Sequence, residues 1–349
     1  MAVRRAIENP IISPADVRPS RPDFEVICVI NAGVARLGDE VILLLRVVER
    51  PLHDDESVYL APVFNERTGV VDLIPFPLND PRYNFSDPRM IGTPDSTYLT
   101  ALSHLRLARS RDGVRFTVED APALFPANAY ETYGIEDPRI TQIGDSYYVN
   151  YVAVSRLGIV TALARTHDFK TFERMGIIFA PENKDVVIFP EKIGGKYAAL
   201  HRPSAHGIGA PEIWSAESPD LMCWGNHRHM VGLRDNGWED ARIGGSAVPF
   251  RIDQGWLAIY HGANRQNRYS MAALLLDKDR PWKVLARSNR PILEPETDYE
   301  RFGFFNNVVF SCGALYEDGL VKMYYGAADT VMALAELPIQ DVLETLQPV

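Results

Sequence analysis

The sequence predicts an all-β fold, a five-bladed β-propeller with a short C-terminal helix, formed by residues 1–349 as a single domain. Three observations lead to this prediction. A glycine-turn hairpin recurs five times along the chain, an acidic turn recurs four times, and helical periodicity is scarce.

The recurring hairpin is a tight turn, usually with Gly, between two short apolar runs, a pattern typical of paired antiparallel strands. The first runs contain INAGVARL, DPRITQI, VVIFPEKI, GSAVPFRI and VVFSCGALY. The second runs read GDEVILLLR, GDSYYVNYV, GGKYAALHR, QGWLAIYHG and DGLVKMYYG, and they begin at Gly38, Gly144, Gly194, Gln254 and Asp318. Five hairpins of one kind indicate five similar structural units.

A second repeat follows most of the hairpins. In it, a strand of small residues ends at an acidic turn, and a bulky residue begins the next strand. The copies are centred on Asp112, Asp168, Asp220 and Asp279, at intervals of 56, 52 and 59 residues. Together the two repeats predict about four strands per unit, the size of a propeller blade. An ordinary β-sandwich with coincidental hairpins is the alternative that the pattern leaves open.

Two segments fall outside the repeats. The first two glycine turns are 106 residues apart, and we expect His53 to Asp80, which is rich in Asp and Pro, to be a long inserted loop. We expect the C-terminal stretch 338–347 to be a helix, because Pro338 can take the first helical position and Ile339, Val342 and Leu346 recur at helical spacing.

Composition and motifs exclude several classes of protein. The formal charge of −10 argues against a non-specific nucleic-acid binder. The chain lacks an apolar run long enough for a signal peptide or a membrane span, so we expect a cytoplasmic protein. It also lacks a nucleophile elbow, a zinc-protease helix and a P-loop. The eight histidines have no metal-ligand spacing, and Cys28, Cys223 and Cys312 are isolated and expected to be buried thiols.

The ends of the five hairpins carry polar residues that would meet at one mouth of a propeller channel. The set is rich in cations for an acidic protein, which is typical of an anion site, because Arg can donate two parallel hydrogen bonds to phosphate. Pairing of each cation with a carboxylate of a neighbouring blade is the alternative. The candidates are Asn31, Arg46, Asp137, Arg139, Lys184, Asp185, Arg202, Arg242, His261, Asn306, Asn307 and Asp329.

Asp137 is the candidate general acid. Glu136, Asp137 and Arg139 bracket Pro138, which bends the backbone as a strand begins. A carboxyl group beside a second acid is expected to have a raised pKa, which suits proton donation. An Asp that only accepts turn hydrogen bonds is the alternative. Trp238 and Tyr269 lie outside the alternating core pattern and are candidates for stacking on a sugar ring.

Several segments, taken in order, carry a family resemblance that extends over almost the whole chain. They are EDPRI at Glu136, FPEKIGGKYAALHRP at Phe189, RIGG and GWLAIYHG after Arg242, PILEPE at Pro291, and NNVVFSCG and YYGAADT after Asn306. On these segments the chain resembles glycoside hydrolase family 130, five-bladed propellers that include β-mannoside phosphorylases and β-1,2-mannosidases.

The resemblance implies roles for the candidate residues. Asp137 is the implied general acid, which protonates the glycosidic oxygen through a hydroxyl group of the bound mannosyl unit. The implied phosphate-binding residues are Lys184, Arg202, Arg242, His261 and Tyr269, with Arg242 and Lys184 at positions where phosphorylases of the family carry Lys and Arg. The implied substrate-binding residues are Asn31, Arg46 and Asp329, joined from the same mouth by Glu136, Arg139 and Asp185.

The implied activity is that of an inverting β-mannoside phosphorylase, which forms α-mannose 1-phosphate from β-1,2-linked or other β-linked manno-oligosaccharides. Inorganic phosphate is then the co-substrate, no further cofactor and no metal are expected, and assembly into a homo-oligomer is left open. Two alternatives stay open. One is an inverting β-1,2-mannosidase, for which Glu239 in GWEDARIGG is the candidate base that activates water. The other is a non-catalytic propeller that binds glycans.

Overall fold

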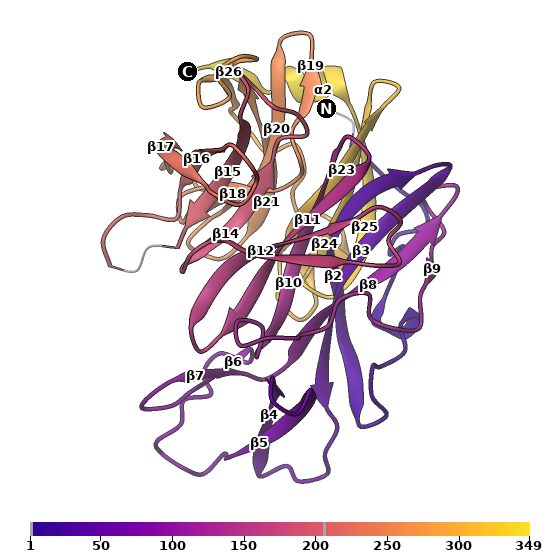
Figure 1. The fold of residues 1–349 in the computed structure, drawn as a ribbon, viewed down its shortest axis with the longest axis vertical. Helices are drawn as coiled ribbons and strands as arrows, with labels where there is room; N and C mark the ends of the chain where they lie inside the picture. The colour runs from indigo at the N-terminus through magenta and orange to yellow at the C-terminus, as the bar shows by residue number, and fades with distance from the viewer. Residues whose placement is uncertain (1–2, 205–206) are drawn as a thin grey trace.

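Strands dominate the computed structural model, which describes residues 3–204 and 207–349 of the chain. Figure 1 shows twisted sheets set side by side, with a narrower extension at the lower end. The helical segments of the described residues are short: η1 (Pro14–Asp16), a 3₁₀ turn, α1 (Asp298–Arg301) and α2 (Ile339–Leu343). Within the described ranges, no helix is long and apolar enough to cross a membrane. The prediction of a nearly all-β chain is confirmed.

The largest sheet has eight strands and consists of two antiparallel groups. The groups join where β8 and β10 pair in parallel, with Ser103 opposite Gly134. The strands are β2 (Phe24–Leu37), β3 (Glu40–Pro51), β8 (Leu102–Ser110), β9 (Thr117–Val118), β10 (Gly134–Ile143), β11 (Ser146–Ser155), β12 (Gly158–Thr166) and β13 (Glu173–Phe179).

Three further large sheets follow in chain order. The first contains β14 (Asn183–Ile188), β15 (Tyr197–Pro203), β16 (Ile213–Ser218) and β17 (Gly225–Val231). The second contains β18 (Arg242–Gly245), β19 (Phe250–Ile252), β20 (Gly255–Ala263), β21 (Tyr269–Leu276), β22 (Val284–Ser288) and β26 (Leu346–Pro348). The third contains β23 (Val309–Glu317), β24 (Leu320–Ala327), β25 (Val331–Pro338) and β1 (Arg4–Arg5).

This last sheet joins the two ends of the chain. The N-terminal strand β1 pairs antiparallel with β25, with Arg4 opposite Glu336. Beside it, Arg5 donates to the buried carboxylate of Glu300 at 2.7 Å, and Tyr325 donates to the same carboxylate at 2.7 Å. Both termini lie at the upper end of Figure 1. The sheet is therefore complete only when both ends of the chain are in place.

Both predicted repeats are present in the structure. Each of the five turns connects two paired antiparallel strands. In the acidic turns, the carboxylates of Asp112, Asp168 and Asp220 accept hydrogen bonds from the backbone N–H groups two and three residues later. In the fourth copy these bonds are made by Asp277 and not by Asp279, so the prediction was centred two residues too late.

The segment 53–80 is not the loop that we predicted. β4 (Val58–Asn65) and β5 (Val70–Pro77) pair along their whole length, and β6 (Met90–Gly92) and β7 (Thr97–Leu99) form a second hairpin. We call residues 52–101 the arm; it forms the lower extension in Figure 1. The arm folds because it buries its own small apolar clusters, such as Ala61 with Phe76 and Ile91.

The C-terminal prediction is also wrong at both ends. Pro338 ends β25 and stands before α2 instead of inside it, and the helix stops at Leu343. Leu346 belongs to β26, where it pairs with Ser288 of β22. Apolar spacing alone cannot show that a strand edge is available nearby, and here pairing with β22 prevails over helical continuation.

Apolar side chains fill the spaces between neighbouring sheets. Ile42 and Leu44 of β3, for example, pack in one cluster with Val149 and Tyr151 of β11. Cys28 and Cys312 are buried as predicted, whereas Cys223 is exposed. The reason is its position in the turn after Asp220, which accepts a hydrogen bond from the backbone N–H of Cys223.

Candidate active site

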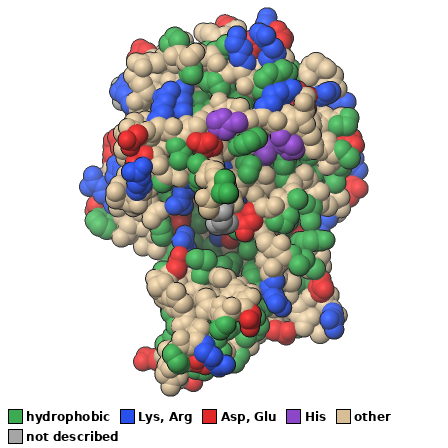
Figure 2. Space-filling view, turned by 90° about the vertical axis from the view of Figure 1, so that its left-hand side faces the viewer, with side chains coloured by type: hydrophobic (Ala, Val, Ile, Leu, Met, Phe, Trp, Pro, Cys, Tyr) green, Lys and Arg blue, Asp and Glu red, His purple; other side chains and the backbone are tan. Residues whose placement is uncertain are grey.

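Eleven of the twelve residues to which the family resemblance gives a catalytic, phosphate-binding or substrate-binding role line one cavity of about 200 Å³. Figure 2 shows that the molecule is hollowed between its main body and the arm, with acidic and basic side chains beside the hollow. The predicted residues in the cavity wall are Asn31, Arg46, Glu136, Asp137, Lys184, Asp185, Arg202, Arg242, His261, Tyr269 and Asp329. Strands from all the large sheets therefore contribute to a single site.

Three of these side chains reach the cavity through the same local distortion of the backbone. Asn31, Asp137 and Asp185 have φ values of 51°, 46° and 54°. The pairing register of β2, β10 and β14 shifts at these positions. A bulge with a left-handed residue re-aims one side chain, and Asn and Asp tolerate that conformation better than most residues. Each of the three strands thus presents one polar group to the cavity.

Asp137 is held by donors on one oxygen. Its Oδ1 accepts hydrogen bonds from Nδ2 of Asn31 at 2.9 Å and from Nη1 of Arg46 at 3.1 Å. Burial works to raise the pKa of Asp137, but the charges of Arg46 and Arg139 and the bond from Asn31 outweigh it and hold the pKa below its ordinary value. The predicted rise of this pKa is therefore wrong, because cations and not the neighbouring acid dominate.

Glu136 links two of the cations in the wall. Arg46 donates from Nη2 to its Oε1 at 2.8 Å, and Nζ of Lys184 lies 3.6 Å from its Oε2. The neighbouring acid is thus occupied by ion pairs, which is why it does not act on Asp137 as an uncompensated negative charge. Arg46 at the same time joins Glu136 to Asp137.

Arg139 does not line the cavity, so the structure gives no support to its predicted contact with substrate. It is fully buried and donates to the backbone carbonyls of Asp137 at 3.0 Å, Gly245 at 3.1 Å and Ser246 at 3.3 Å. It also donates to Asp185 at 3.3 Å. These bonds tie the two bulges to β18, so Arg139 is a positioning residue behind the wall.

Asp185 organises the other side of the cavity. Its Oδ2 lies 2.7 Å from Nε of Arg202 and 3.5 Å from Nε2 of His261. Burial works to raise the pKa of Asp185, but the charges of Arg202 and Arg139 outweigh it and keep the group ionised. Burial, with further help from Arg202, lowers the pKa of His261 to about 3, so this imidazole is neutral at physiological pH.

Arg242 is the cation of the wall without an acidic partner among the described residues. It donates to the hydroxyl of Tyr269 at 2.8 Å and to Oδ1 of Asn267 at 2.9 Å. Both acceptors are neutral. Burial raises the pKa of Tyr269, so its hydroxyl stays protonated and can donate in turn. The positive charge of Arg242 is therefore oriented but not neutralised.

Asp329 occupies the turn between β24 and β25, again in the left-handed region with a φ of 47°. Burial raises its pKa to about 6, a rise opposed by Arg46 and supported by the nearby charge of Asp137. Unlike Asp137 and Asp185, this carboxyl group therefore changes protonation state near neutral pH.

Four residues of the wall were not predicted from the sequence: Arg89, Phe305, Val308 and Phe310. Arg89 had no signal, because it lies outside both predicted repeats and beyond the predicted loop 53–80. The other three flank Asn306 and Asn307, two candidates that are absent from the wall. Asn306 instead accepts a bond from the backbone of Gly303, and the backbone of Asn307 accepts one from Tyr269.

Two other candidates lie outside the cavity. Trp238 packs against the ring of Tyr260, with centroids 6.3 Å apart, so it is not placed to stack on a ligand in this site. Glu239 is fully buried and accepts hydrogen bonds from Tyr260 at 2.7 Å, Asn236 at 2.9 Å and Arg287 at 2.5 Å. It does not border the cavity and is not placed to activate water there.

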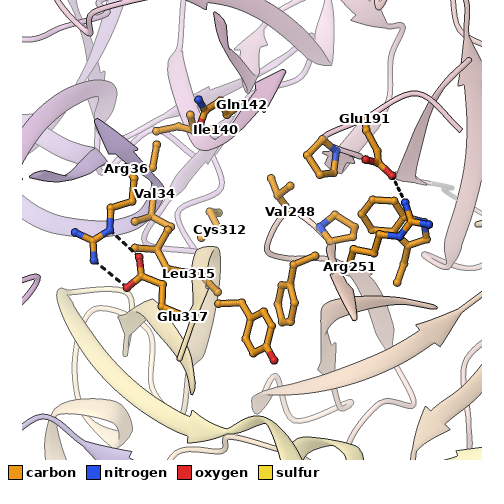
Figure 3. A pocket seen from close by; sticks show the side chains of 18 residues that line it. Val34, Arg36, Ile140, Gln142, Glu191, Val248, Arg251, Cys312, Leu315 and Glu317 are labelled. Atoms are coloured by element: carbon orange, nitrogen blue, oxygen red, sulfur yellow. Dashed lines mark hydrogen bonds and ion pairs between the residues drawn. The ribbon is translucent and has the colours of Figure 1, made fainter. Parts of the chain in front are cut away.

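A second cavity of about 420 Å³ opens elsewhere on the same strands, past the bulges of β2 and β10. Figure 3 shows its mixed lining, with Val34, Ile140, Cys312 and Leu315 between charged side chains. Those charges are neutralised in pairs: Arg36 with Glu317 at 2.7 Å and Arg251 with Glu191 at 2.6 Å. The larger hollow therefore lacks the unneutralised cation that marks the first cavity.

The first cavity combines a carboxyl group held between donors, a buried carboxyl that titrates near neutrality and an arginine with a free charge. Five cations face four carboxyl groups in its wall. Such a site can hold a small anion beside a polar, hydroxyl-rich ligand. Among the described residues, no group of three or more His, Cys, Asp and Glu side chains is arranged to hold a metal ion.

Comparison with known proteins identifies relatives of this chain. A family model described as beta-1,4-mannooligosaccharide phosphorylase, that of glycoside hydrolase family 130, matches residues 89–348. A beta-1,2-mannobiose phosphorylase of Listeria innocua is 51% identical over 99% of both chains. A 1,2-beta-oligomannan phosphorylase of a Thermoanaerobacter species is 40% identical over 71% of this chain and 83% of its own.

A solved structure extends the likeness to three dimensions. The Listeria innocua beta-1,2-mannobiose phosphorylase in complex with beta-1,2-mannobiose superimposes with a TM-score of 0.96, at 51% identity and over 99% of both chains. Sequence identity at this level, coverage of both chains and the family model agree. The chain belongs to glycoside hydrolase family 130.

Proposed function

We propose that this protein is an inverting phosphorylase of β-1,2-linked mannosides, which converts β-1,2-mannobiose and inorganic phosphate into α-mannose 1-phosphate and mannose. The proposal depends mainly on one observation: the positive charge of Arg242 has no carboxylate partner among the described residues. The names and the 51% identity of its relatives support the choice of linkage.

Phosphate is proposed to bind on the Arg242 side of the cavity. Arg242, Arg202 and Lys184 supply positive charge, and Tyr269 and His261 supply uncharged polar groups. Lys184 and Arg202 already have acidic partners, so the site offers limited net charge and suits one small anion better than a polyanion. The bound phosphate is the nucleophile that attacks the anomeric carbon of the mannosyl unit.

The mannosyl unit is proposed to lie against Asn31, Arg46 and Asp329, with Asp137 as the general acid. Attack by phosphate on the face opposite the leaving group inverts the configuration at the anomeric carbon, so the β-mannoside gives an α-phosphate. Asp137 supplies the proton that leaves with the second sugar, relayed through a hydroxyl group of the mannosyl unit. The C–O bond to the leaving sugar breaks as the bond to phosphate forms.

The lowered pKa of Asp137 requires a source for its proton when substrate is bound. A phosphate dianion brought into the same cavity opposes the cations and raises carboxyl pKa values. A sugar that competes for the guanidinium of Arg46 removes one of the two bonds that favour the carboxylate. We infer that Asp137 becomes protonated only in the ternary complex, which couples acid catalysis to phosphate binding.

The hydrolytic alternative needs a base on the nucleophile side. Glu239, the candidate from the sequence, is enclosed by Arg287 and Tyr260 outside the cavity. The carboxyl groups that do border the cavity are engaged by Arg46, Arg202 and Lys184, or belong to the proposed mannosyl site. A β-1,2-mannosidase is therefore the weaker proposal, and a non-catalytic glycan binder leaves the placement of Asp137 without a purpose.

The wider setting is part of the same proposal. The proposal of five blades is supported by five antiparallel groups, namely β2 with β3, β8 and β9, then β10–β13, β14–β17, β18–β22 and β23–β25, and β1 would close the ring on β25. We propose a single five-bladed propeller with phosphate as co-substrate and no further cofactor. The cytoplasmic location and the homo-oligomer remain predictions, to be checked by cell fractionation and light scattering.

The decisive experiment is incubation of the purified protein with β-1,2-mannobiose in the presence and absence of inorganic phosphate. We expect α-mannose 1-phosphate, detected by phosphorus NMR, and an equal amount of mannose, only when phosphate is present. Equal release of mannose without phosphate would overturn the proposal in favour of the mannosidase. Binding of mannobiose without turnover would favour the glycan-binding alternative.

A further inference from the structure

The arm is an insertion in an otherwise short connection. β3 and β8 are antiparallel neighbours that pair from Val41 opposite Ser110 to Glu49 opposite Leu102, yet the arm of residues 52–101 separates them. The corresponding connection between β11 and β12 is only Arg156 and Leu157. An insertion of this length, between paired strands that need only a tight turn, calls for a role beyond connection.

The arm is fixed against the main body. The backbone N–H of Phe64 donates to the carbonyl of Thr132 at 2.8 Å, and Tyr98 packs against Tyr133 with ring centroids 5.7 Å apart. Thr132 and Tyr133 immediately precede β10, the strand that carries Asp137. The arm therefore packs against the residues that lead into the strand of the proposed general acid.

Arg89 is the side chain of the arm that enters the wall of the catalytic cavity. Asp87 holds it through two bonds, Nε to Oδ1 at 3.0 Å and Nη2 to Oδ2 at 2.8 Å. Its guanidinium carbon lies 4.8 Å from the ring centre of Phe305, another residue of the wall. Clamped by a carboxylate and stacked on a ring, the guanidinium is held in place before any ligand arrives.

Arg89 lies near the mouth of the catalytic cavity and not at its floor. The side chain of Arg89 is 46% exposed, against 18% for Arg46 and 11% for Asp137. Asp137 and Arg46, the proposed general acid and a proposed mannosyl-binding residue, are thus more deeply buried than Arg89. Asp329 and Tyr269 line the same cavity as Arg89.

A β-1,2-linked disaccharide in this cavity has one mannosyl unit at the floor and the other toward the mouth, because the leaving sugar must depart outward. We propose that Arg89 binds the hydroxyl groups of this outer, leaving sugar, and so selects the acceptor when the reaction runs in reverse. The inference rests on the proposed phosphorylase function. The guanidinium of Arg89 can donate hydrogen bonds to the hydroxyl groups at the edge of a pyranose. The neighbouring Phe305 ring suits the apolar face of the same sugar.

The arm also offers a matched control. Asp80 and Arg82 repeat the Asp-Pro-Arg sequence of Asp87 and Arg89, with bonds from Arg82 Nη2 to Asp80 at 2.6 Å. The guanidinium of Arg82 likewise lies over a neighbouring ring, 5.5 Å from the centre of Tyr83. Arg82 does not line the catalytic cavity. Replacement of Arg82 therefore measures the effect of removing an equivalent Asp–Arg pair from the arm without changing the cavity wall.

The test compares Arg89→Ala, Arg89→Lys and Arg82→Ala in both directions of the reaction, with thermal unfolding as the check on folding. For Arg89→Ala we expect the KM for β-1,2-mannobiose and for mannose as acceptor to rise about tenfold or more, as for loss of a charge-assisted hydrogen bond. The KM values for phosphate and α-mannose 1-phosphate should change less than about twofold. For Arg89→Lys we expect KM values between those of the wild type and Arg89→Ala, because Lys keeps the positive charge but cannot donate two parallel hydrogen bonds.

Each other outcome overturns the inference in a recognisable way. An equal rise in the KM for α-mannose 1-phosphate would assign Arg89 to the inner sugar or to phosphate. Unchanged constants, or the same changes in Arg82→Ala, would show that Arg89 does not contact the sugar. A wild-type protein that forms no mannose 1-phosphate would instead overturn the proposed function itself, before the variants are compared.

Discussion

Asn31 donates its side-chain amide to Asp137 at 2.9 Å, although 106 residues of sequence separate them. Both residues have a left-handed backbone, and both sit where the pairing of their strand shifts register. The bond exists because two bulges on different strands re-aim two polar side chains toward one point. It favours the carboxylate form of Asp137 and fixes which oxygen remains available.

Replacement of Asp137 by Asn tests the proposed general acid. We expect kcat for phosphorolysis to fall by about 10²- to 10⁴-fold, the usual contribution of a positioned proton donor, with the KM for phosphate little changed. Asn keeps the size of the side chain, so the thermal unfolding midpoint should stay close to that of the wild type. Asp39→Asn, at a site 77% exposed, is the control. Retention of more than about a tenth of the activity would remove Asp137 from this role.

Replacement of Arg242 by Ala tests the anion site. We expect the KM for phosphate to rise by about 10- to 100-fold, because a charge-assisted contact is lost, while the KM for mannobiose changes much less. Arg251→Ala is a suitable control, since Arg251 pairs with Glu191 beside the second cavity. Steady-state kinetics at varied phosphate measures the effect. A rise confined to mannobiose would place the sugar, and not phosphate, at Arg242.

Replacement of Asp329 by Asn should change how stability depends on pH. In the folded protein the pKa of Asp329 is raised from 3.8 to about 6, so the native state binds this proton more tightly than the unfolded chain. Stability from this group is present at low pH and is lost as the pH rises from about 4 through about 6. At about 1.4 kcal/mol per pKa unit, the loss amounts to about 2 to 3 kcal/mol.

The variant should therefore gain stability relative to the wild type at pH 8 more than at pH 4. Urea unfolding of both proteins at the two pH values measures the difference. An identical pH dependence in the two proteins would show that Asp329 does not have a raised pKa in the native state.

Replacement of Gly244 by Ala tests how tightly the phosphate side is packed. A Cβ at this position would lie 2.7 Å from Cε1 of His261 and would overlap Oδ2 of Asp185. Moving these groups should cost about 1 to 3 kcal/mol of stability and lower kcat/KM for phosphate by about 100-fold. Gly225→Ala, in β17, meets open space and should do neither. Equal effects of the two substitutions would contradict this packing.

The sequence by itself determined the repeat, because tight turns and strand alternation are local properties. The turns at Gly38 and Gly319 and the acidic turns at Asp112 and Asp168 require only that a few neighbouring residues bond to one another. Polar residues interrupting apolar strands likewise identified most of the site, since an Asp such as Asp137 or Asp185 is costly inside a sheet unless it has partners.

The tertiary structure decided what those partners are. The pKa of Asp137 is lowered and not raised, because Arg46 and Asn31 come from another strand group, and Glu239 is withdrawn from the site by Arg287. The same holds for Arg89, which the arm brings into the cavity wall. The protonation state of a side chain, and whether that side chain lines a cavity, depend on contacts between segments that are distant in sequence. No local sequence pattern specifies those contacts.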